Sequence, residues 1–288
     1  MNKTLAIILC VGLGLVALIF QLPKGNVSNT TSNAPAGGAN RDAKGDDHQD
    51  EHTAESATKS EDTHAAPLTN AQQAAVAKLK SELSQAKTEV SQSSVLDKLI
   101  NTFVGANHYD SAAYYAGQFA DQHPALNNFL RAGQLYFEAQ TYALNPTKGK
   151  AMGEKARVYF EQVLSKDPSN LLVKTNLAMT YVDTPTPMKG ITLLREVIEQ
   201  EPTFVPALFN LGILSIKSNQ FGKGQERFTQ ILKLEPTNYK AALNLGFCLA
   251  QLDKLDEAKK VLRMVLDKSK DPEETKAAQE LLAEMQKH

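Results

Sequence analysis

The sequence lacks several residue types on which whole classes of protein depend. Its 288 residues contain no tryptophan and only two cysteines, Cys10 and Cys248. Cys10 lies in an N-terminal apolar run and Cys248 in a helical repeat, so we expect no disulfide within the chain. We expect the thiol of Cys248 to be a small buried apolar group.

The sequence also lacks an excess of charge of one sign. Its formal net charge is −1 and aromatic residues make up 7% of it, so nucleic acid is not an expected partner. It has no Gly-rich phosphate loop, no nucleophile elbow and no pair of Cys or His residues at metal-ligand spacing. We therefore predict that the protein is not an enzyme, with no catalytic residue, no cofactor and no metal site.

What the sequence does contain is a repeat of 34 residues between Ala156 and Leu266. Four columns of small or apolar residues recur with this step: Ala156, Gly190, Gly224 and Ala258; Phe160, Leu194, Phe228 and Leu262; Val163, Val197, Ile231 and Val265; Leu164, Ile198, Leu232 and Leu266. This spacing describes one apolar face of a helix. An acid followed by proline then ends the helix in three units, at Pro168, Pro202 and Pro236. A fixed period of this length predicts a solenoid.

The array resembles the tetratricopeptide repeat (TPR) family in its Leu-Gly pair, its Ala or Gly column, its Phe or Leu column and its closing proline. The resemblance implies an all-α fold, in which helical hairpins stack into a right-handed superhelix. We expect about five hairpins over 93–272 and a C-terminal capping helix over 273–288. The first hairpin turns at 107–110, and the residues 142–150 are an insertion that lengthens the turn of the second hairpin. Tyr142 and Leu144 in this insertion are either a contact patch or simply the end of a longer hairpin.

The N-terminal residues differ from the rest in composition. The run from Thr4 to Leu22 is nearly all apolar, and a helix of this length approaches the ~30 Å core of a bilayer. No small residues mark a cleavage site near its end, so we interpret 1–22 as an uncleaved transmembrane signal anchor that contacts lipid through residues 4–22. Lys3 favours a cytoplasmic N-terminus. The rest of the chain then lies outside the cytoplasmic (inner) membrane, in the periplasm of a two-membrane bacterium.

Two segments connect this anchor to the repeats. Residues 23–67 are polar, with eight acids against four bases, and we expect a disordered linker. Residues 68–92 are expected to form a leading helix. Its apolar residues are spaced like a short coiled-coil seam: Val76, Leu79, Leu83, Ala86 and Val90. The helix either lies against the first repeat or mediates self-association.

The resemblance also implies a binding groove, because the first helices of TPR hairpins line the concave side of the superhelix. Matching positions place these residues on that wall: Thr175, Asn176, Met179, Phe209, Asn210, Ile213, Lys240, Leu243, Asn244 and Phe247. The three Asn residues form a ladder whose amides can both donate to and accept from a peptide backbone, unless they bond within their own hairpins. Only Lys240 supplies a positive charge, so an apolar peptide or helix fits this wall better than a terminal carboxylate.

Three hypotheses follow for function. The first is a membrane-tethered scaffold that binds a peptide or helix of an envelope protein in its groove. The second is a homo-oligomer that acts as a structural spacer, assembled through 68–90 and the solenoid. The third is a regulatory subunit of an envelope enzyme complex. The sequence does not separate the third from the first.

Overall fold

The computed structural model describes residues 66–286, and this part of the chain is entirely helical, with twelve helices and no strand. The first five helices are α2 (Asn70–Gln85), α3 (Glu89–Gly105), α4 (Tyr109–Gln122), α5 (Leu126–Thr141) and α6 (Pro146–Lys166). They are followed by α7 (Leu171–Met179), α8 (Pro187–Gln200), α9 (Val205–Lys217), α10 (Phe221–Leu234), α11 (Tyr239–Gln251), α12 (Leu255–Lys268) and α13 (Pro272–Glu284). The anchor expected over 1–22 and nearly all of the linker expected over 23–67 lie outside the described residues.

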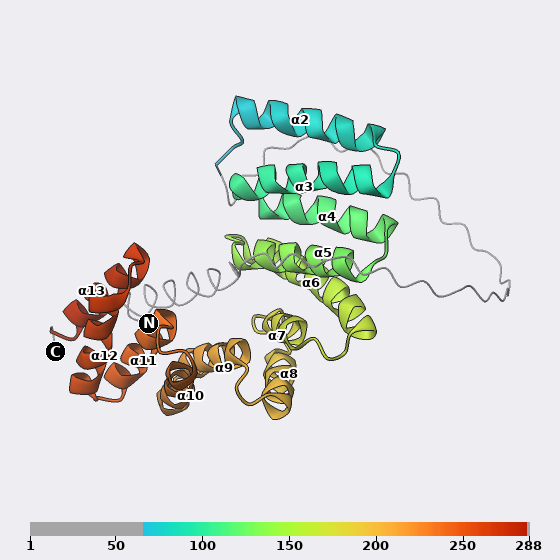
Figure 1. Cartoon of the computed structure of the whole chain (residues 1–288). Coiled ribbons are helices and arrows are strands. Elements are labelled where there is room, and N and C mark those ends of the chain that lie inside the picture. Colours follow the sequence, from blue (N-terminus) through green and yellow to red (C-terminus); the bar gives the residue numbers. More distant parts are fainter. Residues whose placement is uncertain (1–65, 287–288) are drawn as a thin grey trace.

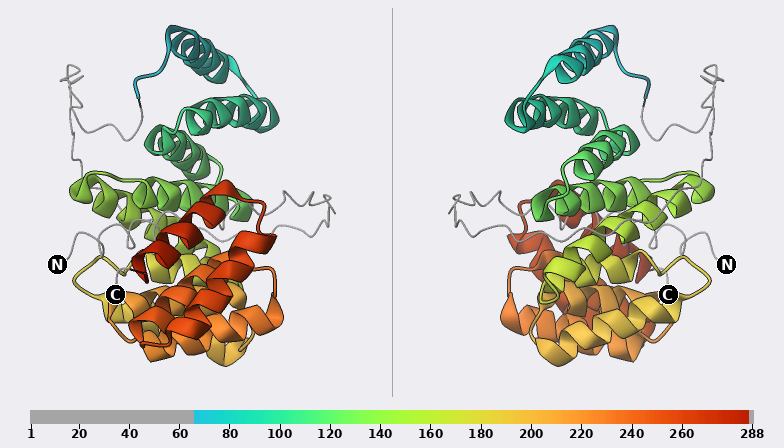
Figure 2. Two further views of the ribbon diagram at one scale, coloured as in Figure 1. Left: turned by 90° about the vertical axis from the view of Figure 1, so that its left-hand side faces the viewer. Right: turned by 90° about the vertical axis from the view of Figure 1, so that its right-hand side faces the viewer.

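Helices α3 to α12 form five hairpins, with α2 before them and α13 after them. Consecutive helices pack against one another in chain order, and the described chain follows an arc (Figures 1 and 2). Helices α2 to α6 are stacked at one end of the arc, and α9 to α13 form the other end. The expected solenoid of helical hairpins is confirmed, and α13 is a last helix that packs on α11 and α12.

Within the hairpins, small residues let the two helices approach closely. A β-carbon added at Gly212 of α9 would lie 2.6 Å from the ring of Phe228 on α10, and Phe228 is completely buried. In the third hairpin the close contact comes from the second helix, where a side chain at Gly190 would collide with the backbone carbonyl of Ala178. Phe228 and Gly190, which both belong to the repeat columns of the sequence, therefore lie at contacts between helices.

Acidic residues close three of the second helices, as the sequence predicts. Asp167, Glu201 and Glu235 are the C-cap residues of α6, α8 and α10, and each is followed by proline. The proline has no N–H to continue the helical hydrogen bonds, so the chain leaves the helix there.

The leading helix is shorter than the one expected over 68–92. Helix α2 ends at Gln85, and Thr88 then caps a new helix by accepting a hydrogen bond from the backbone N–H of Ser91. Val76, Leu79 and Leu83 pack on the core of the N-terminal half, whereas Val90 is 81% exposed on α3. Most of the apolar seam of α2 therefore packs within the chain, against the N-terminal hairpins.

The expected long turn in the second hairpin is instead mostly helix. The side chain of Asn145 accepts hydrogen bonds from the backbone N–H groups of Thr147 and Lys148, and Pro146 occupies the first position of α6. Asparagine at the N-cap followed by proline is a strong helix start. The additional residues therefore lengthen α6, and only 142–145 remain as a turn.

Candidate functional site

The predicted inner wall lies on the first helices of the third, fourth and fifth hairpins, α7, α9 and α11. Only Met179 and Lys240 of the ten predicted residues are partly exposed. The other eight are buried: Thr175, Asn176, Phe209, Asn210, Ile213, Leu243, Asn244 and Phe247. The structure places the ten residues on three neighbouring helices. Of the ten, Met179 and Lys240 are the ones that remain accessible to a partner.

Two asparagines of the ladder, Asn244 and Asn176, differ in their hydrogen bonds. The amide of Asn244 donates to the backbone carbonyl of Lys240 at 2.8 Å, a bond within its own helix. Asn176 is 1% exposed, and neither its Nδ2 nor its Oδ1 atom has a hydrogen-bond partner. Beside it, the hydroxyl of Thr175 donates to the carbonyl of Leu171. In Asn176 the donor and the acceptor are therefore both buried and unmatched.

Most of the apolar residues predicted for the wall contribute to packing. The ring of Phe209 meets Phe228 edge to face, with ring centroids 5.5 Å apart, and Ile213 and Leu243 belong to the same C-terminal core. The ring of Phe247 meets Phe221 of the adjacent hairpin at 5.9 Å. An acidic substitution at Phe209 would therefore disturb the core rather than report on binding.

Lys240 lies close to acids of the capping helix. Burial lowers the pKa of its ammonium group below the ordinary value. The charges of Glu274 and Asp271 offset this effect only in part. Both acids stand at the start of α13, which packs on α11. Because these carboxylates already balance the one cation of the predicted wall, a terminal carboxylate of a ligand gains little there.

A second group of polar residues lies where the turns of the first two hairpins meet. The rings of Tyr109 and Tyr142 are stacked, with centroids 4.5 Å apart and planes inclined by 11°. Nearby, the ammonium of Lys148 lies 2.6 Å from the carboxylate of Asp110. Burial raises the pKa of Glu138, which interacts with both tyrosines, to about 7. Sequence reasoning singled out Tyr142 but missed Glu138, since a single acid on a helix carries no pattern.

The third hairpin is joined to the second by an arginine. Nη1 of Arg157 on α6 donates to the carbonyl of Thr180 at 2.8 Å, and its guanidinium lies 4.9 Å from the centre of the Tyr181 ring. Lys189 of α8 lies 4.8 Å from the centre of the same ring. These contacts fix the irregular segment 180–186 between α7 and α8.

The remaining candidates for chemistry in residues 66–286 do not assemble into a reactive site. Cys248 is fully buried, and burial raises the pKa of its thiol to about 12, so it is an unreactive apolar group as predicted. No group of three His, Cys, Asp or Glu residues in this range is arranged to hold a metal. None of the helices described is both long and apolar enough to span a bilayer.

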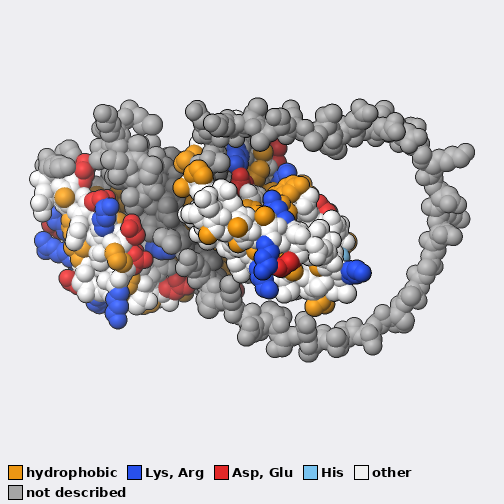
Figure 3. Space-filling model, turned by 90° about the horizontal axis from the view of Figure 1, so that it is seen from above, with side chains coloured by type: hydrophobic (Ala, Val, Ile, Leu, Met, Phe, Trp, Pro, Cys, Tyr) orange, Lys and Arg blue, Asp and Glu red, His pale blue; other side chains and the backbone are white. Residues whose placement is uncertain are grey.

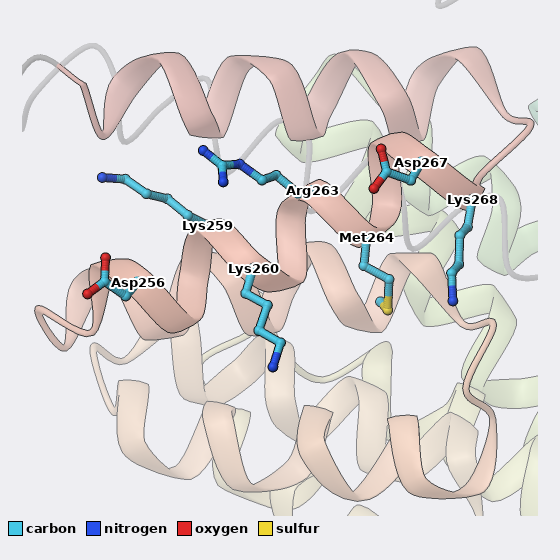
Figure 4. A pocket seen from close by; sticks show the side chains of 7 residues that line it. All are labelled: Asp256, Lys259, Lys260, Arg263, Met264, Asp267 and Lys268. Atoms are coloured by element: carbon cyan, nitrogen blue, oxygen red, sulfur yellow. The ribbon is translucent and has the colours of Figure 1, made fainter.

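The surface of α12 carries a hollow of about 660 Å³ lined by charged side chains of both signs together with Met264 (Figure 4). The charged residues are Asp256, Lys259, Lys260, Arg263, Asp267 and Lys268. All of them come from one helix, and they point outward like the charged face of any surface helix. On the face shown in Figure 3, basic and acidic side chains of the described part are likewise interspersed.

Comparison with known proteins supports this description of the fold. Residues 216–285 match the tetratricopeptide repeat family. No curated protein matches the sequence. A tetratricopeptide repeat protein from Parabacteroides merdae superposes with a TM-score of 0.53 at 13% identity, covering 75% of this chain and 86% of that chain. A thermophilic TPR protein from Thermus thermophilus superposes with a TM-score of 0.50 at 15% identity, covering 65% of this chain and 96% of that chain. The described chain is thus an all-helical TPR-like solenoid.

Proposed function

We propose that this TPR-like solenoid is a non-enzymatic scaffold for protein–protein interaction, and that residues 4–22 tether it to a membrane. The TPR-like fold by itself suggests an interaction scaffold. The bound segment is a peptide or helix of a partner protein of the cell envelope, and it lies along α7, α9 and α11. The interaction surface begins at the partly exposed Met179 on α7, and the amide of Asn176, which is buried in the unbound chain, becomes accessible only as the segment binds.

The observation that carries this proposal is the unmatched amide of Asn176. A buried polar group without a hydrogen bond costs about 1–3 kcal/mol, so native structures keep few of them. A peptide backbone offers an N–H and a C=O, which together satisfy the acceptor and the donor of one amide side chain. Met179 lies one helical turn further along α7 and remains partly exposed, so an apolar side chain of the same segment has a contact beside the amide.

Two substitutions of similar size separate binding from stability. Asn176→Leu removes an amide that has no partner, so we expect the midpoint of unfolding to stay the same or rise. Asn244→Leu removes the hydrogen bond to the carbonyl of Lys240, and we expect that variant to be less stable. If the amide of Asn176 serves a bound peptide, Asn176→Leu loses the partner even though its fold is intact.

The binding test uses a photo-crosslinking amino acid in the full chain, expressed in its native membranes. Placed at Met179, it should link to one defined protein, identified by mass spectrometry, and the additional change Asn176→Leu should reduce that product. Placed at Val158, which is 55% exposed on α6, it should not give the same product. The same product from both positions, or no effect of Asn176→Leu, would refute the assignment of the site.

A further inference from the structure

The meeting point of the first two hairpins contains two tyrosines that hold each other in place. Tyr109 begins α4, and Tyr142 is the C-cap of α5. Their rings are stacked at 4.5 Å, and their side chains are hydrogen-bonded to each other. Tyr109 packs on the N-terminal core, whereas Tyr142 is 37% exposed. The ring of Tyr142 therefore forms an accessible aromatic surface, and the ring of Tyr109 beneath it holds it in place.

A carboxylate lies beside this surface without a positive partner among residues 66–286. Glu138 stands one turn before Tyr142 on α5, and its backbone carbonyl accepts the N–H of Tyr142 at 3.0 Å. No described residue donates a hydrogen bond to its side chain or pairs with it. The cation of the neighbouring turn, Lys148, is already paired with Asp110. Burial makes the charged form of Glu138 costly. A cation bound beside the carboxylate would offset that cost, so the site favours a positively charged ligand.

The rest of the chain shows which cation suits such a surface. In the described part, Lys80 lies 5.2 Å from the centre of the Tyr115 ring, Lys155 lies 5.3 Å from that of Tyr136, and Arg157 lies 4.9 Å from that of Tyr181. An ammonium or guanidinium over a tyrosine ring is attracted by the ring, and its aliphatic stem packs on the same apolar surface. The pair of Tyr109 and Tyr142 has no such cation from the described residues, although the carboxylate of Glu138 interacts with both rings.

We propose that Tyr142 and Glu138 form a binding site for a lysine or arginine side chain of a partner polypeptide, separate from the inner wall. The carboxylate pairs with the charged end, and the exposed tyrosine contacts the stem. A negatively charged group is excluded, because Glu138 would repel it and Lys148 is occupied. A divalent cation is disfavoured, because one carboxylate supplies too few of the six or more oxygen ligands that such ions take.

This assignment also predicts how binding depends on pH. The titratable groups that interact with Glu138 are Tyr109 of α4 and Tyr142 of the following turn, and both are neutral phenols at pH 7. The adjacent charges of Asp110 and Lys148 compensate each other. Glu138 therefore controls the charge of the site, and the cation is bound less tightly as the pH falls below about 7.

The test is an NMR titration of the full chain with three blocked tripeptides, observing the ring signals of Tyr142. Acetyl-Ala-Lys-Ala-amide is the probe, and the norleucine and glutamate versions are its controls. We expect saturable shifts with the lysine peptide and binding about tenfold weaker or absent with the others, a difference of about 1.4 kcal/mol. Glu138→Gln should weaken the binding of lysine by a similar factor. The matched change Glu82→Gln, at a partly exposed acid of α2, should leave it unchanged.

Several results would overturn the proposal: equal binding of the norleucine peptide, unchanged binding in Glu138→Gln, or no shift at millimolar lysine peptide. Tighter binding of free spermidine than of the lysine peptide would assign the site to a small diffusible cation instead. Because Glu138→Gln removes a buried charge, its unfolding midpoint at pH 8 should not fall, so a loss of binding is not explained by unfolding. Failure of this test leaves the inner-wall site untouched, since the two sites share no residue.

Discussion

Pro185 stands at the hairpin position that Asn219 occupies 34 residues later, and the two residues produce different turns. Asn219 has a positive φ of 57°, and Asp253, one repeat further on, has a φ of 58°. In both hairpins the next N–H bonds back to the first helix, as Gln220 does to the carbonyl of Ser215 at 2.7 Å. Proline is locked near −65° and cannot adopt this conformation. Helix α7 accordingly has 9 residues, where α9 and α11 each have 13.

The first prediction concerns a proline placed at the corresponding position of the next hairpin. Asn219→Pro forces φ to the wrong sign and removes the N–H that bonds to the carbonyl of Ile216, so we expect a loss of about 2–4 kcal/mol from the C-terminal half. Urea unfolding of the full chain, followed by circular dichroism, measures it. Asn219→Gly keeps the positive φ and should be close to neutral. Equal stability of the proline and glycine variants would show that the turn does not depend on the left-handed residue.

The second prediction concerns the contact between Gly212 and Phe228. Gly212→Ala brings a methyl group to 2.6 Å from the fully buried ring of Phe228, so the ring or the two helices must shift, and we expect a loss of about 1–3 kcal/mol. Gly222→Ala is the matched control, because nothing lies within 4 Å of the added methyl group on α10. Alanine is the better helix former, and this variant should gain up to about 1 kcal/mol. Thermal unfolding of the two variants should therefore shift in opposite directions.

Much of this fold follows from the sequence, because the repeat columns record helix contacts directly. The alternation of small and bulky residues predicts the hairpins, and the acid–proline pairs predict where three second helices end. The division between α2 and α3 was missed, since the apolar spacing continues through it and the break depends on the cap made by Thr88 and Ser91. The different turn between α7 and α8 could have been predicted, because Pro185 stands at a repeat position where the next two hairpins have Asn219 and Asp253.

The candidate site follows from the sequence only in outline. Periodicity places Asn176, Phe209 and Phe247 on one row of helices, but it does not say which side chains remain accessible. Burial depends on the curvature of the stack and on the capping helix, neither of which is encoded in a single repeat. Glu138 was likewise invisible, because its environment is created by two tyrosines from different hairpins.

The third prediction concerns pH and stability. Burial raises the pKa of Glu138 from 4.5 to about 7, so between these values the folded chain binds more protons than the unfolded chain. The free energy of unfolding contributed by this group is highest below pH 4.5 and falls as the pH rises to about 7, by about 3 kcal/mol at most. Asp110 has a lowered pKa, because the bond from Lys148 and the N–H of Ser111 outweigh its burial. Its effect is confined to more acidic pH and leaves this window undisturbed.

Urea unfolding of the wild-type chain and of Glu138→Gln between about pH 4 and pH 8 checks this prediction. The wild-type midpoint should decline across the window, and the glutamine variant should show a flatter profile. The two proteins should differ most at the alkaline end, with the variant the more stable. Parallel profiles would show that Glu138 is solvated well enough to keep its ordinary pKa.

The last prediction concerns the proposed tether, residues 4–22, which lies outside the described residues. If this run anchors the protein, the full chain should stay in the membrane pellet after washing with alkaline carbonate, because a span is held by about 20 residues of hydrocarbon contact. A variant with aspartates at Leu13 and Leu15, each costing about 2.5–3.5 kcal/mol at the centre of a span, should be released. Alkaline phosphatase fused after His288 should be active if Lys3 keeps the N-terminus in the cytoplasm, and inactive phosphatase on a carbonate-resistant protein would reverse the orientation. Release of the unaltered chain by carbonate would remove the tether, while leaving the crosslinking test at Met179 unaffected.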